Sequence, residues 1–204
     1  MQRGFGGGRG AVSKGIEDRF EIDGSVLSAA QQGDRRALSV IVEVYDGRLR
    51  HLAHHLLRSP DSVDDVMQDV YVRVLGSLRT FRRASTLGSW LYRVTYNTCL
   101  SELRRRRHGI VEALCLASSA READPAEQVL DRSTLKALLH SLPPDQRAAV
   151  LLVDAYDLGY RRASEILDCP MSTVASRVKV ARARLRVALR PNDAARQVPS
   201  LGQR

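Results

Sequence analysis

The stretch Tyr160–Arg186, YRRASEILDCPMSTVASRVKVARARLR, decides the fold of this chain. Pro170 has no backbone N–H and clashes with a preceding helical turn, so the segment predicts two helices separated by a turn that ends at this proline. Ser172 or Thr173 is suited to cap the second helix, because hydroxyl oxygens accept hydrogen bonds from free N–H groups. A short helix, a three-residue turn and a longer helix match the spacing of a helix-turn-helix.

The second helix of this pair divides into an apolar face and a basic face. Its apolar residues recur at three- and four-residue steps, at Val174, Val178, Ala181, Leu185 and Ala188. The other faces carry Thr173, Ser176, Arg177, Lys179, Arg182 and Arg184. A recognition helix requires this division, because one face packs while the N-terminal turns present donors to bases and phosphates. The alternative is an amphipathic helix in an ordinary αα-hairpin.

The helical period extends over two blocks of the chain, residues 26–108 and 129–190. The segment 109–128 loses the period and is predicted to be a linker. The Gly-rich residues 1–25 and the polar residues 191–204 are predicted to be tails. Strand signals are nearly absent. The sequence therefore predicts an all-α protein with two small helical domains joined by a flexible linker.

Breaks within the two blocks predict the individual helices. Gly33-Asp34 precedes a helix that ends before Ser59-Pro60-Asp61, and a third helical pattern runs from about Thr86 to Arg106. In the second block, Pro143-Pro144 interrupts the helical pattern, which resumes from Asp145 to Tyr156.

The composition excludes several classes of protein. The chain has 204 residues, of which 44% are hydrophobic, so it can bury a core. Aromatic residues make up only 5%, which argues against a β-sandwich or an aromatic-lined carbohydrate site. The three scattered cysteines do not indicate a disulfide scaffold. No stretch approaches the roughly 20 apolar residues of a membrane span, and the sequence predicts a cytoplasmic protein without membrane insertion.

The net charge of +9 is segregated along the chain. Residues 61–69 hold four aspartates and no base, residues 79–107 hold eight arginines and one acid, and residues 161–190 hold eight bases and two acids. Two basic blocks predict two separate phosphate-binding surfaces, although a solvated helix face is the alternative for either one. The acidic block is predicted to face solvent or a basic protein surface, because contact with DNA would be unfavourable.

Three stretches in order resemble bacterial RNA polymerase sigma factors of the sigma-70 class, in their small extracytoplasmic-function form. Asp64–Val74, DDVMQDVYVRV, is similar to the acidic helix that docks on the polymerase clamp helices. Phe81–Arg107 is similar to the segment that melts and reads the −10 promoter element. Leu142–Arg147 and the helix-turn-helix resemble the −35-binding domain. The resemblance covers residues 27–189.

The resemblance implies three sets of site residues. Those expected to bind the β and β′ subunits of core RNA polymerase are Asp64, Asp65, Gln68 and Asp69. Those expected at the −10 element are Arg82, Arg83, Ser85, Trp90, Arg93, Asn97, Arg104 and Arg105. Those expected at the −35 element are Arg161, Arg162, Ser172, Thr173, Ser176, Arg177, Lys179 and Arg182. A flipped base would sit in the loop of residues 78–85, while Trp90 is either a base-stacking residue or part of the core.

The resemblance implies a promoter-specificity subunit that needs no cofactor or metal and separates strands without covalent catalysis. Its partners would be core RNA polymerase, promoter DNA and, as is common in the family, an anti-sigma factor. The sequence departs from the family pattern at Tyr160–Ser164, at Asp168 and at Met171-Ser172, which affects the exact −35 contacts.

Two other functions are weighed against this interpretation. A stand-alone, dimeric helix-turn-helix regulator would bind duplex DNA without polymerase, but two unlike basic domains and a linker count against it. A metal-dependent nucleic-acid hydrolase would use the region from His51 to Asp69. His51 and His55 have the four-residue spacing of a metal-binding pair, but no nearby Cys or Glu completes a site.

Overall fold

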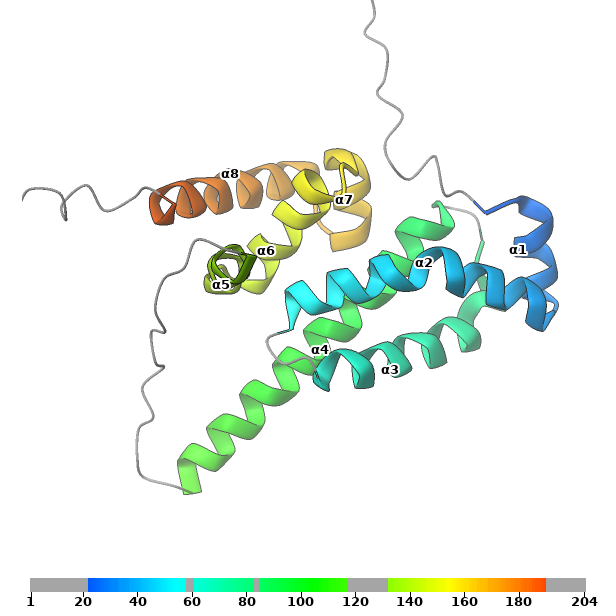
Figure 1. The fold of residues 1–204 in the computed structure, drawn as a ribbon, viewed down its shortest axis with the longest axis horizontal. Coiled ribbons are helices and arrows are strands. Elements are labelled where there is room, and N and C mark those ends of the chain that lie inside the picture. Colours follow the sequence, from blue (N-terminus) through cyan, green and yellow to red (C-terminus); the bar gives the residue numbers. More distant parts are fainter. Residues whose placement is uncertain (1–21, 58–60, 83–84, 117–131, 190–204) are drawn as a thin grey trace, which may run out of the picture.

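The computed structural model describes residues 22–57, 61–82, 85–116 and 132–189, and every regular element within these ranges is helical (Figure 1). The helices form two groups, one before and one after residues 117–131. The prediction of an all-α protein with two helical domains is confirmed.

The first domain begins earlier and its last helix ends later than the sequence pattern predicts. Its elements are α1 (Gly24–Gln31), α2 (Arg35–Leu56), α3 (Asp61–Ser77), the 3₁₀ turn η2 (Leu78–Thr80) and α4 (Leu87–Leu116). The predicted tail to residue 25 is too long, because Asp23 caps α1 by accepting a hydrogen bond from Ser25 N at 2.7 Å. Helix α4 extends into the predicted linker, where residues 112–114, Glu-Ala-Leu, are good helix formers although the apolar period fades.

The predicted break between α1 and α2 is confirmed. Gly33 has a φ of 95°, a conformation that glycine adopts without steric cost. Asp34 then caps α2, because its carboxylate accepts hydrogen bonds from Arg36 N at 2.7 Å and Ala37 N at 3.3 Å. This cap fixes the direction in which the 22-residue helix α2 crosses the domain.

The core of the first domain uses the apolar positions that periodicity predicts. Leu49, Leu52 and Leu56 of α2 are at most 1% exposed, and Met67 and Val70 of α3 are fully buried. Burying each such side chain contributes ~1.5–3 kcal/mol. Helices α2, α3 and α4 pack against one another, so the residues of α3 between its buried positions face outward.

The second domain contains two helix pairs. Its elements are α5 (Arg132–Ser141), α6 (Pro144–Val150), the π-helical turn η3 (Leu151–Ala155), α7 (Gly159–Leu167) and α8 (Met171–Ala188). Pro144 occupies the first helical position of α6, where its missing N–H costs nothing. The predicted interruption at Pro143-Pro144 is therefore confirmed.

The helix-turn-helix forms at the predicted turn, but its second helix starts earlier than expected. Asp168 ends α7 in the left-handed region with a φ of 49°. Helix α8 begins at Met171, so capping by Ser172 or Thr173 is wrong: both lie inside the first turn. The Pro170 carbonyl accepts hydrogen bonds from Thr173 N at 2.9 Å and Val174 N at 3.1 Å instead.

The predicted apolar face of α8 is confirmed over its first three turns. Val174, Val178 and Ala181 are fully buried, Leu185 is half-buried, and Ala188 is exposed. The last turn of α8 therefore extends beyond the core of its domain.

The two domains pack directly against each other, which the sequence pattern did not indicate. Helix α7 contacts α4, and α5 and α6 contact α2. The rings of Tyr92 and Tyr156 are 5.6 Å apart, and Tyr96 Oη donates a hydrogen bond to Asp145 at 3.2 Å. We call this contact region the domain junction.

Candidate polymerase- and nucleic-acid-binding surfaces

The outer face of α3 carries the predicted acidic residues. Asp65, Gln68 and Asp69 are exposed at three- and four-residue spacing, and the buried Val66 and Val70 lie on the opposite side. Asp64 differs from them, because its carboxylate accepts a hydrogen bond from Arg50 at 2.5 Å. Three of the four predicted residues thus form a continuous polar face that is open to solvent.

Two exposed apolar residues extend this face, and sequence reasoning missed them. Val72 is 70% exposed and Leu75 is 54% exposed, at steps of three residues after Asp69. An exposed apolar stripe on a helix typically marks a contact surface. The signal was available in the sequence, because both residues continue the spacing of Asp65, Gln68 and Asp69. We call these five residues the α3 docking face.

The predicted base-binding loop is attached to α1 by a residue that sequence reasoning also missed. Gln31 Nε2 donates hydrogen bonds to the carbonyls of Leu78 at 3.1 Å and Phe81 at 3.0 Å. Arg82 is exposed and Ser85 is half-exposed, whereas Arg83 lies outside the described residues. The role of Gln31 could not be predicted from residue spacing, because its hydrogen-bond partners are backbone carbonyls about fifty positions away.

Trp90 combines the two alternatives that the sequence left open. Its ring packs against Phe81, with centroids 5.1 Å apart, at the edge of the core. The side chain is nevertheless only half-buried, so part of the indole faces solvent beside the loop. Trp90 is therefore part of the core and also an accessible aromatic surface.

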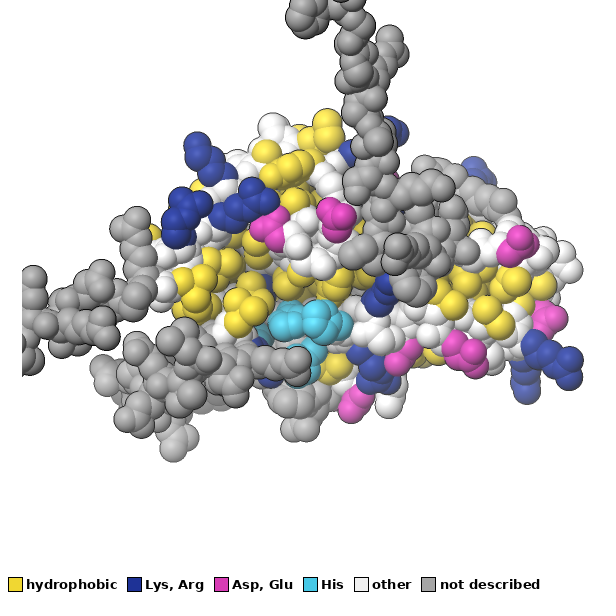
Figure 2. All heavy atoms as spheres, turned by 45° about the horizontal axis from the view of Figure 1, so that its top comes forward, with side chains coloured by type: hydrophobic (Ala, Val, Ile, Leu, Met, Phe, Trp, Pro, Cys, Tyr) yellow, Lys and Arg dark blue, Asp and Glu magenta, His cyan; other side chains and the backbone are white. Residues whose placement is uncertain are grey.

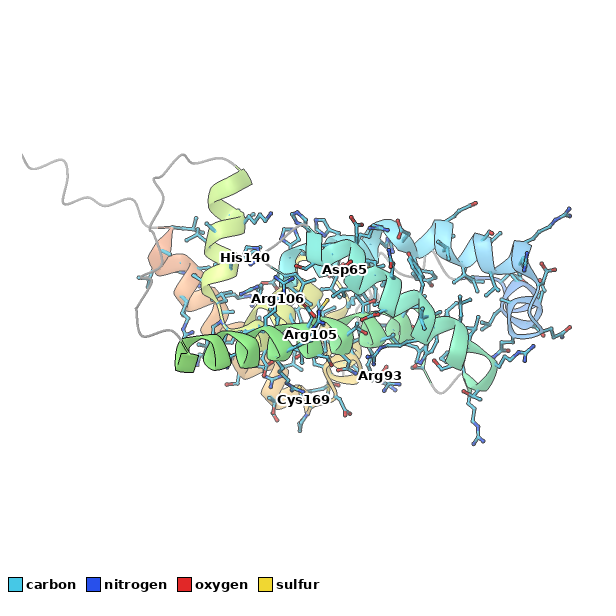
Figure 3. The ribbon with its side chains drawn as sticks, turned by 90° about the horizontal axis from the view of Figure 1, so that it is seen from below. Asp65, Arg93, Arg105, Arg106, His140 and Cys169 are labelled. Atoms are coloured by element: carbon cyan, nitrogen blue, oxygen red, sulfur yellow. The ribbon has the colours of Figure 1, made fainter. Side chains whose placement is uncertain are left out.

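Three predicted −10 residues share one face of α4. Arg93, Asn97 and Arg104 follow at spacings of four and seven residues, and Asn97 and Arg104 are exposed. Figure 3 labels Arg93 on the side of α4 that also faces Cys169 of the second domain. These side chains can track a nucleic-acid backbone along the helix axis.

Arg105 belongs to a separate cluster with Glu102 and Arg106, because its guanidinium donates a hydrogen bond to the Glu102 carboxylate. The buried Glu102 carboxylate accepts hydrogen bonds from Arg105 Nε at 2.9 Å and Arg106 Nε at 2.6 Å. Burial opposes ionisation of Glu102, yet the hydrogen bonds from Arg106 and Arg105 hold its pKa below the ordinary value. The carboxylate thus remains charged and fixes the start of the arginine run.

The predicted −35 residues divide into exposed side chains and side chains paired within the protein. Ser172, Ser176 and Lys179 are exposed, and Thr173 is half-exposed. Arg177 Nη2 donates to Asp145 at 2.9 Å, and Arg182 Nε donates to Asp154 at 2.9 Å. Of the first-helix pair, Arg161 lies 3.6 Å from Glu165 and Arg162 is half-exposed.

A cavity of about 990 Å³ at the domain junction brings both basic surfaces together. Its lining includes Arg104, Arg106 and Arg107 of α4 and Arg177 of α8, together with leucines from both domains. Asp145 is its only carboxylate among the lining residues. Arg104 and Arg177, predicted for different promoter elements, thus line one space.

Four histidines, His51, His54, His55 and His140, lie at the domain junction. His51 Nε2 and His55 Nε2 are 3.1 Å apart, and His51 Nδ1 is 2.7 Å from Tyr156 Oη. Figure 2 shows the imidazoles gathered at the surface between apolar side chains. Within the described residues, no three His, Cys, Asp or Glu side chains converge as a metal site, so the hydrolase alternative gains no support.

Comparisons with known proteins match both domains. The family model for Sigma-70 region 2 matches residues 41–109, and the family model for Sigma-70, region 4 matches residues 132–185. These two regions define a sigma-70-type transcription factor. The ECF RNA polymerase sigma-E factor of Escherichia coli K12 is 30% identical over 78% of this chain and 90% of the relative. The chain belongs to the extracytoplasmic-function (ECF) sigma factors, which act in transcription initiation.

Further relatives and solved structures agree. The ECF RNA polymerase sigma-E factor of Haemophilus influenzae is 29% identical over 83% of this chain and 96% of the relative. A sigma factor RpoE solved with the anti-sigma factor NepR from Bartonella quintana has 28% identity and a TM-score of 0.64, covering 76% of this chain and 98% of that chain. Within the described residues, no helix is long and apolar enough to cross a membrane.

Proposed function

We propose that the α3 docking face binds core RNA polymerase at its β and β′ subunits. The observation that carries this proposal is that Asp65, Gln68 and Asp69 form one exposed face with Val72 and Leu75. Apolar side chains bordered by carboxylates suit a basic helical surface with an apolar centre. The face remains exposed while the two domains are packed together, so polymerase can reach it without any movement of the domains.

The promoter contacts are assigned to two basic helices. Arg93, Asn97 and Arg104 on α4 would hold the separated strand of the −10 element, with Trp90 beside the base-binding loop. Ser172, Ser176 and Lys179 on α8 would enter the major groove of the −35 element. This activity consists of binding and capture of unstacked bases, without a cofactor and without covalent catalysis.

An anti-sigma factor is the third proposed partner. One solved structure similar to this chain is a sigma factor RpoE bound to the anti-sigma factor NepR, and CnrH, which was solved with the cytosolic domain of CnrY, shares the fold. The junction cavity, with five arginines from α4, α6 and α8 and leucines from both domains, suits an acidic amphipathic segment. We place the protein in the cytoplasm, where core polymerase and promoter DNA are found.

Transcription in vitro tests the polymerase and promoter assignments together. Core polymerase is given a pool of genomic promoters with and without this protein, and start sites are mapped by sequencing. The Asp65→Ala/Asp69→Ala variant is expected to lose the start sites that the wild type adds. Glu43→Ala, which removes an exposed carboxylate from α2, is the matched control and is expected to retain them.

The outcomes separate the candidate functions. New start sites that depend on the α3 docking face support the proposal and reveal the −10 and −35 sequences. Tight duplex binding without any dependent start site would favour the stand-alone regulator instead. The comparisons do not favour that alternative, because the matched family models cover both domains in the order of a sigma factor.

A further inference from the structure

The closed arrangement of the two domains cannot engage a whole promoter. Arg104 and Arg177 line one cavity of about 990 Å³. The −10 and −35 elements are about 25 base pairs apart by their names, or about 85 Å at 3.4 Å per base pair. If α4 contacts the −10 element and α8 contacts the −35 element as proposed above, the domains must separate before both contacts form.

Two interactions of the histidines near the domain junction require a neutral imidazole, and the first of them crosses between the domains. The Lys136 ammonium donates to His54 Nε2 at 3.3 Å, and the Arg147 guanidinium donates to His140 Nδ1 at 3.0 Å. Neither Lys nor Arg has an acceptor, so each receiving nitrogen must carry a lone pair. The contact between His51 Nε2 and His55 Nε2 also excludes two protonated rings, because one nitrogen must accept.

The second domain brings basic groups and one phenol to this cluster. Lys136 and His140 approach from α5, Arg147 from α6, and Tyr156 from the residue after η3, while Arg48 lies on α2 itself. Among the described residues, the charges that act on His55 are His51, His54, Lys136 and Arg147, all of them basic. An added proton on this cluster would therefore be repelled while the domains are together.

We propose that the cluster of His51, His54, His55 and His140 is a pH-sensitive latch that holds the two domains closed. When His54 is neutral, it accepts a hydrogen bond from Lys136 across the junction, His51 stays beside Tyr156, and the proposed DNA-binding surfaces stay together. When His54 and His55 are protonated, they repel each other and the Lys136 and Arg147 cations of the second domain, and the domains separate. The latch regulates the promoter contacts proposed above and rests on that proposal.

The direction of the pH effect follows from His55. Burial, followed by the charges of His51 and His54, lowers the pKa of His55 to about 4. Opening removes the burial at the junction and the charges of Lys136 and Arg147, so the pKa of His55 rises toward the ordinary value of about 6.5, while His51 and His54 stay beside it on α2. The open state thus binds more protons between about pH 4 and 6.5, so acidification favours it. From pH 7.5 to 5.5, His55 alone shifts the closed–open equilibrium roughly three- to tenfold after solvent screening.

Small-angle X-ray scattering of the full chain tests the latch without polymerase or DNA. The radius of gyration is measured at pH 7.5, 6.5 and 5.5, with circular dichroism recorded at each pH. For the wild type we expect a compact particle at pH 7.5 and a larger radius at pH 5.5 with unchanged helicity. For His51→Gln/His54→Gln/His55→Gln we expect a radius that does not change with pH. His108→Gln, at the remaining histidine, is the control and should behave like the wild type.

Several results would overturn the proposal. They are an extended wild type at pH 7.5, a radius that does not respond to acid, loss of helicity over this range, or a triple variant that still opens at the wild-type pH. If the triple variant is already extended at pH 7.5, the single variant His54→Gln is measured instead. The amide oxygen of glutamine can still accept a hydrogen bond from Lys136, but the side chain cannot be protonated. A weaker pH response of His54→Gln supports the latch, and an unchanged response overturns it. Failure here would leave the promoter and polymerase assignments intact.

Discussion

Arg147 joins both domains through backbone carbonyls, so replacing it should weaken each of them. The side chain is 3% exposed. Its Nη1 donates to Leu56 O at 2.7 Å and to His55 O at 3.3 Å, and its Nη2 donates to Leu142 O at 2.8 Å and to His140 O at 2.9 Å. Two of these acceptors end α2 of the first domain, and two end α5 of the second.

The expected loss follows from these four contacts. A hydrogen bond from a charged donor contributes ~1.5–3 kcal/mol, and the buried arginine pays a desolvation cost that offsets part of the sum. Removing one partner of such a buried network typically costs ~3–5 kcal/mol. We expect Arg147→Met to lower the free energy of unfolding by that amount, since methionine keeps the apolar stem and leaves the carbonyls unpaired.

Urea unfolding followed by circular dichroism measures this loss. Arg105→Met is the matched control, because Arg105 is 77% exposed and its bond to Glu102 is an i,i+3 pair on one helix. Such an exposed pair contributes at most ~1 kcal/mol. A loss below ~1 kcal/mol for Arg147→Met, or one equal to that of Arg105→Met, would refute the reasoning.

Three further predictions concern side chains with distinct environments. Arg177→Ala should weaken binding to a −35 duplex by ~1–3 kcal/mol, as measured by fluorescence anisotropy. It should also reduce the slope of log affinity against log salt concentration by about one. An unchanged slope would mean that Arg177 keeps its hydrogen bond to Asp145 and does not contact DNA. Glu102→Gln should lower the free energy of unfolding at pH 7, as measured by urea unfolding. The difference in this free energy from the wild type should shrink as the pH falls below about 4.5, because the lowered pKa of Glu102 contributes stability only while the carboxylate is charged. A difference that grows in acid would contradict this. Iodoacetamide at pH 8 should modify Cys169 at least tenfold faster than Cys99. Burial raises the pKa of the Cys99 thiol to about 12, whereas Cys169 is half-exposed. Equal rates of modification in peptide mapping would contradict this prediction.

Local chemistry made most of the fold predictable. The break at Gly33-Asp34 and the stop at Pro143-Pro144 each depend on a few neighbouring residues, and both are confirmed. Capping by Ser172 or Thr173 was wrong for a physical reason. Pro170 is the N-cap residue, so Ser172 and Thr173 lie inside the first turn, and the Pro170 carbonyl accepts hydrogen bonds from the N–H groups of Thr173 and Val174.

The surfaces were less predictable, because their chemistry depends on long-range contacts. The four-residue spacing of Asp65 and Asp69 agrees with their exposure on one face of α3, beside the exposed Gln68. No spacing rule pairs Arg177 with Asp145 or Arg182 with Asp154, since these partners are 32 and 28 positions apart. The roles of these residues toward polymerase and DNA therefore stay predictions.

The π-helical turn Leu151–Ala155 sets the direction in which the chain leaves the domain junction toward α7 and α8. In this turn Tyr156 N donates to Leu151 O at 3.0 Å, one residue further back than in an α-helix. Relaxing it to an α-helical turn would advance the chain by one residue and rotate everything beyond it by about 100°. Tyr156 would then swing away from His51, and α7 and α8 would reorient with it. A single-residue deletion here would thus redirect α8, the helix proposed to contact the −35 element, as a rigid body while leaving its own sequence unchanged.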